Sequence, residues 1–465
     1  MPIRFIVACK RGHLDEFPWM SWVKHNETCK RNKDLTLTSV SAGLAGLILR
    51  CTGCDAVRSM DGIFRKDALV GLRCRGHRPW LPNADEACTE QDPPRVLQRG
   101  ASNLYFPAIQ SALSIPPFND GLRAAFGTAW ATIESLDVDQ REKFVRKLAE
   151  TQVLAGLHLT PDELVKRVNQ QIEILNRPET SNFRWQEYLQ FTLGGSRSIG
   201  EGTEFETRVM PVPPDYAKFI SQVVQARRLR EVRALTGFTR IESPEFSSGA
   251  AGAMARLSKA DLGWLPAIEV RGEGIFLALS KDAVTRWEAR DAVVRHCKTV
   301  HDSYVRLWRE RSGEGGDPPR QITPRLLLTH SLAHALMRQL ALDCGYSMAS
   351  LRERLYVGSG DEDMCGLLVY TATTDADGTL GGLTRQAMPV RLSLVLQSAL
   401  ESMKWCSSDP ICSFGVAAAS EGLNIAACHS CLLAPETSCE EFNHFLDRVT
   451  LFGRPDAPEL GFFTN

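Results

Sequence analysis

The sequence has no run of about 18 consecutive apolar residues, the length from which a transmembrane helix is recognised. Its first residues, M-P-I-R-F-I-V-A-C-K-R-G-H, contain too short an apolar stretch for the core of a secretory signal peptide. We therefore expect no membrane contact and a cytoplasmic location. Thiols stay reduced in that compartment, so the 14 cysteines are expected to bind metal rather than to form disulfides.

The chain also lacks an excess of charge. Its formal net charge of −1 provides no field that would attract nucleic acid, so any contact with DNA requires a local basic surface. The densest cluster of arginines is formed by Arg227, Arg230, Arg233 and Arg240. We expect a helix from Asp215 to about Ala234, in which a spacing of three places the first three arginines on one side for phosphate contact. The alternative is a salt-bridged face, because Glu231 lies among them.

Several enzyme motifs are missing. The sequence contains neither the phosphate-binding loop G-x4-G-K-[ST] nor a G-x-S-x-G elbow, so we expect no ATPase and no serine hydrolase. His330 and His334 have the spacing of a zinc hydrolase motif, but Ser331 stands where the catalytic glutamate belongs. Packing within an apolar helix at 324–343 is therefore the expected role of both histidines.

One enzymatic alternative is left open by the segment D-A-D-G-T at residues 375–379. It imitates the nucleophile loop of haloacid-dehalogenase-type phosphatases, in which two aspartates and a magnesium ion transfer a phosphoryl group. Asp375 and Asp377 would then make the protein a metal-dependent phosphohydrolase or nuclease. The lysine and acidic residues that such enzymes also need do not follow in the required order. We therefore expect no small-molecule substrate.

Cysteine is abundant near the C-terminal end. The pattern Cys406-x5-Cys412-x15-Cys428-x2-Cys431-x7-Cys439 contains a C-x2-C pair, which lets two thiolates reach one ion from a tight turn. A structural zinc ion takes four ligands, so one of the five cysteines is spare or lies next to the site. The competing interpretation is a set of buried free thiols, which behave as small apolar groups. The density of cysteine favours Zn²⁺.

A second cysteine-rich region occupies the first hundred residues. Cys51-x2-Cys54-x19-Cys74-x13-Cys88 is a pattern typical of a zinc ribbon, and we expect these four to share one ion. His77 could replace the last of them.

Four further candidate ligands precede that pattern: Cys9, His13, His25 and Cys29. They form two pairs spaced by four residues, each of which would share one face of a helix. A separate zinc site is one interpretation, and ordinary hydrogen-bonded histidines are the other.

The pattern of apolar and polar residues predicts an α+β, multidomain protein. We expect a zinc-ribbon-like region at 1–95, a mainly helical region at 96–245 and a mixed α/β module with a cysteine zinc site at 246–465. Within the middle region, Thr160 and Pro161 are typical of a capped helix start. Residues 264–279 are predicted to form two strands around a turn at 271–274.

Seven blocks along the chain together resemble a known family. In order they are C-K-R-G-H-L-D-E-F-P-W, R-V-L-Q-R-G-A-S-N-L-Y-F-P, R-L-R-E-V-R-A-L-T-G-F-T-R, W-L-P-A-I-E-V-R-G-E-G-I-F-L, T-H-S-L-A-H-A-L, D-G-T-L-G-G-L and C-H-S-C-L-L-A-P-E-T-S-C-E. The chain resembles the DrmB family, the helicase-associated subunit of the DISARM anti-phage system. Its C-terminal part is similar to the zinc-binding module of some bacterial repair helicases.

The resemblance implies a non-catalytic accessory subunit that binds DNA and a DrmA-like helicase, which supplies ATP hydrolysis in a heterodimer. It also favours Cys428, Cys431 and Cys439 as zinc ligands, together with Cys406 or Cys412. A scaffold that contacts only protein is the alternative within the non-enzymatic class.

Overall fold

The structure is a computed structural model that describes residues 4–26, 29, 34–115, 122–150, 160–175, 182–192, 204–244, 254–260, 262–312, 317–371, 381–414 and 421–464. The chain forms two compact units. The first unit comprises residues 1–110, 234–267 and 308–316, and the second comprises 111–233, 268–307 and 317–465. Helices and sheets occur together, which confirms the α+β class. The predicted domain segments 1–95, 96–245 and 246–465 stay a prediction.

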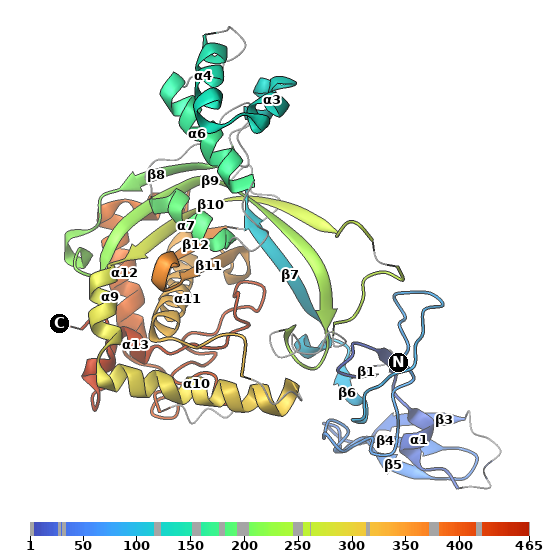
Figure 1. Ribbon diagram of the computed structural model, residues 1–465. Helices are drawn as coiled ribbons and strands as arrows, with labels where there is room; N and C mark the ends of the chain where they lie inside the picture. Colours follow the sequence, from blue (N-terminus) through green and yellow to red (C-terminus); the bar gives the residue numbers. More distant parts are fainter. Residues whose placement is uncertain are drawn as a thin grey trace. The chain divides into compact units, whose positions relative to one another are not determined.

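The first unit contains two small antiparallel sheets (Figure 1). One has the strand order β2-β1-β6, formed by Leu14–Glu16, Phe5–Ala8 and Arg95–Gln98. The other has the order β3-β4-β5, formed by Leu35–Ser39, Leu47–Cys51 and Val57–Ser59. Sheets this short bury little apolar surface, and small domains of this kind commonly need metal ions or disulfides for stability.

A compact aromatic core accompanies these sheets. Helix α1 (Trp19–Val23) buries Trp22, which packs edge-on against Phe17 with ring centroids 5.9 Å apart. The indole N–H of Trp22 donates to the carbonyl of Ser59, and the guanidinium of Arg58 lies 3.5 Å above the indole ring. The helix thereby covers the strand pair that leads into the Cys51 turn, and this holds the turn in place.

Most residues of a six-stranded sheet belong to the second unit. Its order is β11-β12-β10-β9-β7, with β8 paired to β9. The strands are Leu351–Val357, Cys365–Thr371, Ala267–Leu279, Ile220–Thr239, Phe106–Leu113 and, for β8, Glu206–Met210. One face carries helix α7 (Phe183–Thr192), whose Phe191 stacks on Phe276 of β10 with ring centroids 4.7 Å apart.

Helix α11 (Pro324–Cys344) is the buried centre of the second unit. Thr323 caps its first turn, since its hydroxyl accepts the N–H of Leu326, and Gly345 ends it in the left-handed conformation. The helix packs against β11, β12, α12 (Pro389–Met403) and α13 (Val449–Phe452) (Figure 1). Because it is buried over most of its length, its sequence is strongly apolar, as predicted for residues 324–343.

The remaining helices of this unit form two groups. Helices α2 (Leu122–Phe126), α3 (Ala129–Ser135), α4 (Val138–Ala149) and α6 (Pro161–Leu175) share a core of their own. The predicted cap of α6 is confirmed, because the Thr160 hydroxyl accepts the N–H of Glu163 while the Glu163 carboxylate accepts the N–H of Thr160. Helices α9 (Lys281–Glu288) and α10 (Asp291–Ser312) follow β10.

Two predictions of secondary structure are wrong. Residues 220–239 form strand β9 instead of a helix, because pairing with neighbouring strands outweighs the helix propensity of their Arg, Ala and Leu residues. Residues 267–279 form the single strand β10, so 271–274 is no turn. Glycine is required at position 272 because the backbone of Thr371 lies close to it. A Cβ at that position would lie 2.0 Å from the carbonyl oxygen of Thr371.

Candidate metal centres

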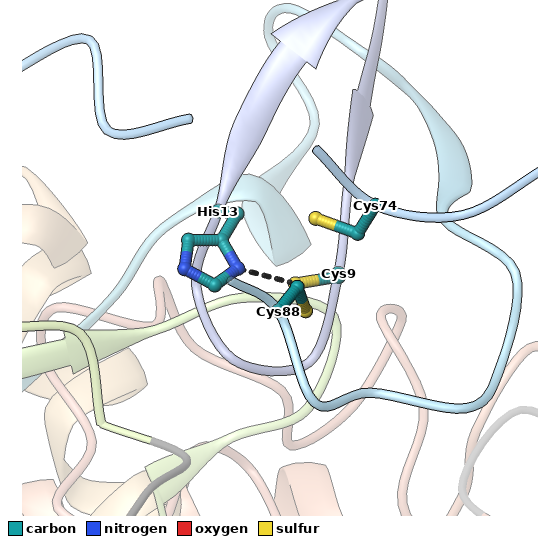
Figure 2. Close-up of side chains that lie close together, drawn as sticks. All are labelled: Cys9, His13, Cys74 and Cys88. Carbon is teal, nitrogen blue, oxygen red and sulfur yellow. Dashed lines mark hydrogen bonds between the residues drawn. The ribbon is translucent and has the colours of Figure 1, made fainter. Parts of the chain in front are cut away.

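The first quartet consists of Cys9, His13, Cys74 and Cys88 (Figure 2). Cys9 follows β1 and His13 precedes β2, so one hairpin turn presents both. The Cys9 sulfur lies 3.3 Å from His13 Nδ1 and 3.9 Å from the Cys88 sulfur. Figure 2 shows the side chains of this hairpin converging with those of Cys74 and Cys88. This is the arrangement that a tetrahedral zinc ion requires.

The backbone around the first quartet stabilises thiolates. The N–H of Gly76 donates to the Cys74 sulfur over 3.4 Å, and the N–H of Glu90 donates to the Cys88 sulfur over 3.4 Å. A hydrogen bond from Cys9, together with one from His13, lowers the pKa of the Cys74 thiol to about 4 despite its burial. Gly76 has a φ of +75°, and a Cβ there would overlap the carbonyl oxygen of Glu86. Only glycine fits this turn.

The second quartet consists of His25, Cys29, Cys51 and Cys54. Cys51 ends β4, and its sulfur accepts the N–H of Gly53 and lies 3.8 Å from the Cys29 sulfur. His25 Nδ1 lies 3.6 Å from the Cys54 sulfur. Hydrogen bonds from the backbone at Asn26 and Ala56, with one from His25, lower the pKa of the Cys54 thiol to about 6.

The structure regroups the N-terminal ligands. Cys51 and Cys54 lie in the second quartet, whereas Cys74 and Cys88 lie in the first, so the expected ribbon of these four cysteines is not formed. Each quartet instead combines one pair from the ribbon pattern with one upstream pair. His77 lies outside the four groups formed by the described residues, and its Nδ1 contacts Asp85 Oδ2 at 2.7 Å.

The cysteine quartet, in the second unit, consists of Cys406, Cys412, Cys428 and Cys431. Sulfur–sulfur distances are 3.5 Å for Cys406–Cys428, 3.7 Å for Cys412–Cys431 and 3.7 Å for Cys428–Cys431. Burial opposes ionisation of Cys428, but the N–H of Ser430 and the neighbouring thiols outweigh burial and lower the pKa to about 6. Four sulfurs at these distances fit Zn²⁺.

An ion pair braces the loop of the cysteine quartet. Asp409 accepts the N–H of Cys406 over 2.8 Å and the N–H of Ser413 over 3.0 Å, and it also pairs with Arg448. Arg448 is 4% exposed and donates to the carbonyl of Met403 at the end of α12. The loop is therefore held to a helix by contacts that do not depend on a metal ion.

Cys439 does not join the other four C-terminal cysteines, contrary to the ligand set that the family resemblance favoured. It lies instead with His330, His334 and Glu353, a group called here the histidine quartet. Both histidines were expected only to pack in the protein core, as part of an apolar helix. Their spacing of four residues was the one signal available in the sequence, and nothing in the spacing pointed to Glu353.

The predicted basic cluster is largely neutralised by carboxylates. Arg227 pairs with Glu206 at 2.9 Å, Arg230 pairs with Glu204 at 2.5 Å and with Glu269, and Arg233 pairs with Glu231 at 2.7 Å. Their side chains are 55%, 23% and 13% exposed, respectively. Because they lie on a strand, a spacing of three does not place them on one face.

Arg240, the fourth of these arginines, is buried in the first unit. Its Nε donates to the carbonyl of Gly12 over 2.8 Å, and its Nη1 donates to the carbonyl of Leu104. The guanidinium also lies over the rings of Trp80 and Phe238. Arg240 thus braces the hairpin that carries the first quartet.

A cavity of about 850 Å³ lies in the second unit. Three arginines line it, and each is paired: Arg184 with Glu440, Arg320 with Glu441, and Arg325 with Glu288 and Asp363. Asp375 and Asp377 lie outside the described residues. Among the described residues, no helix combines the length and apolar character needed to cross a membrane.

The fold and the cysteine-rich quartets define a multidomain α+β protein with several zinc-type sites. Residues 332–432 match the family described as the MrfA Zn-binding domain, and residues 1–106 match a domain of unknown function, DUF8724. DISARM protein DrmB of Bacillus paralicheniformis (strain ATCC 9945a / NCIMB 11709 / CD-2) is 31% identical over 472 residues, which cover 99% of this chain and 82% of that protein. The chain belongs to the DrmB family.

Proposed function

We propose that this chain is a zinc-stabilised, non-catalytic subunit of a DISARM-type anti-phage system, and that it binds a DrmA-like helicase and DNA. The observation that carries the proposal is similarity to DrmB along 99% of the chain. The sequence contains no phosphate-binding loop for ATP. ATP hydrolysis is therefore assigned to the partner.

The geometry of the metal sites supports a structural role for zinc. Each of the first, second and cysteine quartets offers four protein ligands, and a catalytic zinc site normally keeps one position open for water or substrate. Each quartet also joins segments that are distant in sequence. Cys9 and Cys88, for example, are 79 residues apart. The ions would hold loops in place and would not activate a substrate.

The loop of the cysteine quartet offers a surface for a protein partner. Trp405, Ile411 and Phe414 are 71%, 60% and 54% exposed, and each lies within two residues of Cys406 or Cys412 in sequence. Large apolar side chains exposed together are typical of protein interaction sites. We assign this loop to the helicase contact, because four ligands and the Asp409–Arg448 pair hold it rigid.

The proposal is tested by co-purification with a DrmA-like helicase. The wild-type chain should be retained by the tagged helicase. Trp405→Ala should weaken binding by about tenfold or more, as expected for an aromatic side chain that becomes buried at an interface. Trp264→Ala is the matched control, because Trp264 is also exposed, at 63%. Failure of the wild-type chain to bind the helicase would refute the proposed function. Equal loss in both variants would refute only the assigned surface.

Two other functions predict different results. A phosphohydrolase or nuclease would hydrolyse phosphate esters with Mg²⁺ and lose that activity in Asp375→Asn. A protein-only scaffold would bind the helicase without raising the affinity of the complex for DNA. The scaffold draws some support from the carboxylates that pair with Arg227, Arg230 and Arg233. Comparing the DNA affinity of the helicase with and without this chain separates it from the proposed function.

A further inference from the structure

The histidine quartet consists of four side chains whose donor atoms lie within 4.8 Å of one another. His330 Nε2 is 3.0 Å from His334 Nε2, 3.1 Å from Glu353 Oε1 and 3.2 Å from the Cys439 sulfur, and His334 Nε2 is 3.4 Å from Glu353 Oε2. Ligands of a tetrahedral zinc ion are separated by about 3.3 Å between nitrogens and about 3.6 Å between nitrogen and sulfur, given the usual bond lengths. The observed distances approach that geometry.

All four side chains are buried. His330 and Glu353 are 0% exposed, His334 is 1% exposed and Cys439 is 5% exposed. Placing a carboxylate and a thiol among two imidazoles, away from water, is costly unless a charge partner is present. Two neutral imidazoles, one carboxylate and one thiolate carry two negative charges together, and a divalent cation would neutralise them.

Backbone groups orient three of the four ligands from outside. His334 Nδ1 lies 2.7 Å from the carbonyl oxygen of Leu432. Since a carbonyl only accepts, Nδ1 carries a proton, and in the neutral imidazole Nε2 directs a free lone pair toward the centre of the quartet. A carbonyl in this position is the common outer partner of a metal-bound histidine.

The other two orienting contacts involve backbone N–H groups. The Cys439 sulfur accepts the N–H groups of Glu441 and Asn443 over 3.3 and 3.2 Å, as a thiolate at a metal site commonly does. Glu353 Oε1 accepts the N–H of Glu440 over 3.1 Å. Contacts of this kind fix the ligands before an ion binds.

Hydrogen bonds between neutral imidazoles do not satisfy all of these atoms. In neutral His334 with its proton on Nδ1, Nε2 has no proton and cannot donate to Glu353. Glu353 Oε2 is buried and accepts no hydrogen bond from the described residues. With both imidazoles neutral, only His330 Nε2 and the Cys439 thiol could supply protons to the group, whereas a metal ion contacts all four donor atoms at once.

We propose that His330, His334, Glu353 and Cys439 bind a structural Zn²⁺ ion that is separate from the ion of the cysteine quartet. Imidazole and thiolate ligands favour zinc over magnesium or calcium. The four protein ligands leave no open position, so the site is not hydrolytic despite its HxxxH spacing. Ser331, where a hydrolase has its base, instead accepts the N–H of Asp447 over 2.8 Å.

The ion would link three parts of the second unit. The histidines lie on α11, Glu353 lies on β11, and Cys439 belongs to the terminal loop, 109 residues after His330. It would therefore fasten the terminal loop to the central helix. The residues matched by the MrfA Zn-binding domain family, 332–432, end before Cys439.

The test is elemental analysis of the purified full-length chain, with zinc, iron and manganese measured together. Cys439→Ala should contain one zinc ion fewer per chain than the wild type. Cys365→Ala is the matched control, since Cys365 is 1% exposed, lies outside all four groups and should leave the zinc content unchanged. Equal zinc in Cys439→Ala and wild type would overturn the proposal, and so would iron or manganese in place of that ion.

A second measurement covers the case in which Cys439→Ala does not fold. Anomalous scattering at the zinc absorption edge, from crystals of the wild-type chain, should show a peak between His330 and Cys439 in addition to the peak at Cys428. A peak at the cysteine quartet without one at the histidine quartet would overturn the proposal.

Discussion

Arg354 and Glu187 form a buried ion pair with two hydrogen bonds of 2.6 Å, one from Nε to Oε2 and one from Nη2 to Oε1. Their side chains are 0% and 1% exposed. The pair joins strand β11 to helix α7. Tyr356 donates to the same carboxylate over 3.2 Å, and the N–H of Leu113 donates to it over 3.0 Å. Every contact here lies within the second unit.

Replacing Glu187 by Gln should destabilise the protein by about 3–5 kcal/mol, because buried Arg354 would lose its hydrogen-bonded carboxylate. Among the described residues, Arg354 would keep only the more distant carboxylates of Glu231, at 3.8 Å, and Glu440, at 3.9 Å. Urea unfolding followed by tryptophan fluorescence measures the change. Arg227→Gln is the control, since the Arg227–Glu206 pair is exposed and its loss should cost about 1 kcal/mol or less. Similar losses of unfolding free energy in the two variants would contradict the prediction that the buried Arg354–Glu187 pair contributes more than an exposed pair.

The pH dependence of stability should include a contribution from Glu231. This residue is 2% exposed, and burial raises the pKa of its carboxyl, but Arg233, at 2.8 Å, outweighs burial and lowers it overall. A carboxyl whose folded pKa is depressed stabilises the protein above its unfolded pKa, and that stability is lost as pH falls through the folded pKa. Glu231→Gln should therefore destabilise the protein at pH 7 and do so progressively less toward about pH 3.

The measurement is the free energy of unfolding of both proteins between pH 7 and pH 3. Glu436→Gln, at an exposed site, should follow the wild-type curve. A Glu231→Gln curve that runs parallel to wild type over the whole range would contradict the assignment.

The arginines of β9 should differ in their effects on DNA binding. Arg227 is the most exposed of Arg227, Arg230 and Arg233, so Arg227→Gln should weaken binding of all DNA sequences and reduce the salt slope by about one unit. Arg230→Gln should chiefly lower the melting temperature, because Arg230 bridges Glu204 and Glu269. Arg65→Gln, at an exposed site of the first unit, is the control for loss of one charge.

The experiment is a DNA titration at two salt concentrations beside a melting curve. Unchanged affinity and slope in Arg227→Gln would remove this strand from the candidate DNA-binding surfaces.

Zinc at the cysteine quartet should be essential for folding. Structural zinc contributes on the order of 10–16 kcal/mol of apparent binding free energy, so Cys428→Ser should lose one zinc ion per chain and much of its solubility. Acidification should release the ion, because protons compete with Zn²⁺ for the thiolates. Cys297→Ala, which removes a buried thiol outside the quartets, should retain all zinc. A soluble, folded Cys428→Ser chain with wild-type zinc content would contradict this prediction.

Local signals in the sequence were sufficient for several elements. The apolar run that ends at Gly345 predicts helix α11, and Thr160 with Pro161 predicts the start of α6. Caps and periodicity act within a few residues, so they can be read without the fold. The same reasoning failed at residues 220–239, because β9 owes its conformation to strands that lie far from it in sequence.

The sequence by itself determined the chemistry of the predicted ligands, but not that of His330, His334 and Glu353. The residue types of the thirteen predicted ligands, their reduced state and the C-x2-C turns all follow from composition and spacing, and each of the thirteen lies in one of the four groups that the structure forms. Their binding of zinc stays a prediction until it is measured.

Only the tertiary structure decided which ligands lie together. Spacing reports how far apart two residues are along the chain, but a metal site depends on which segments the sheets bring side by side. Pairing of β1 with both β2 and β6 places Cys9 and His13 near Cys88, and packing of α11 against β11 brings His330 to Glu353 and Cys439. A ligand set of this kind is a property of long-range packing, because its members need no local relationship in sequence.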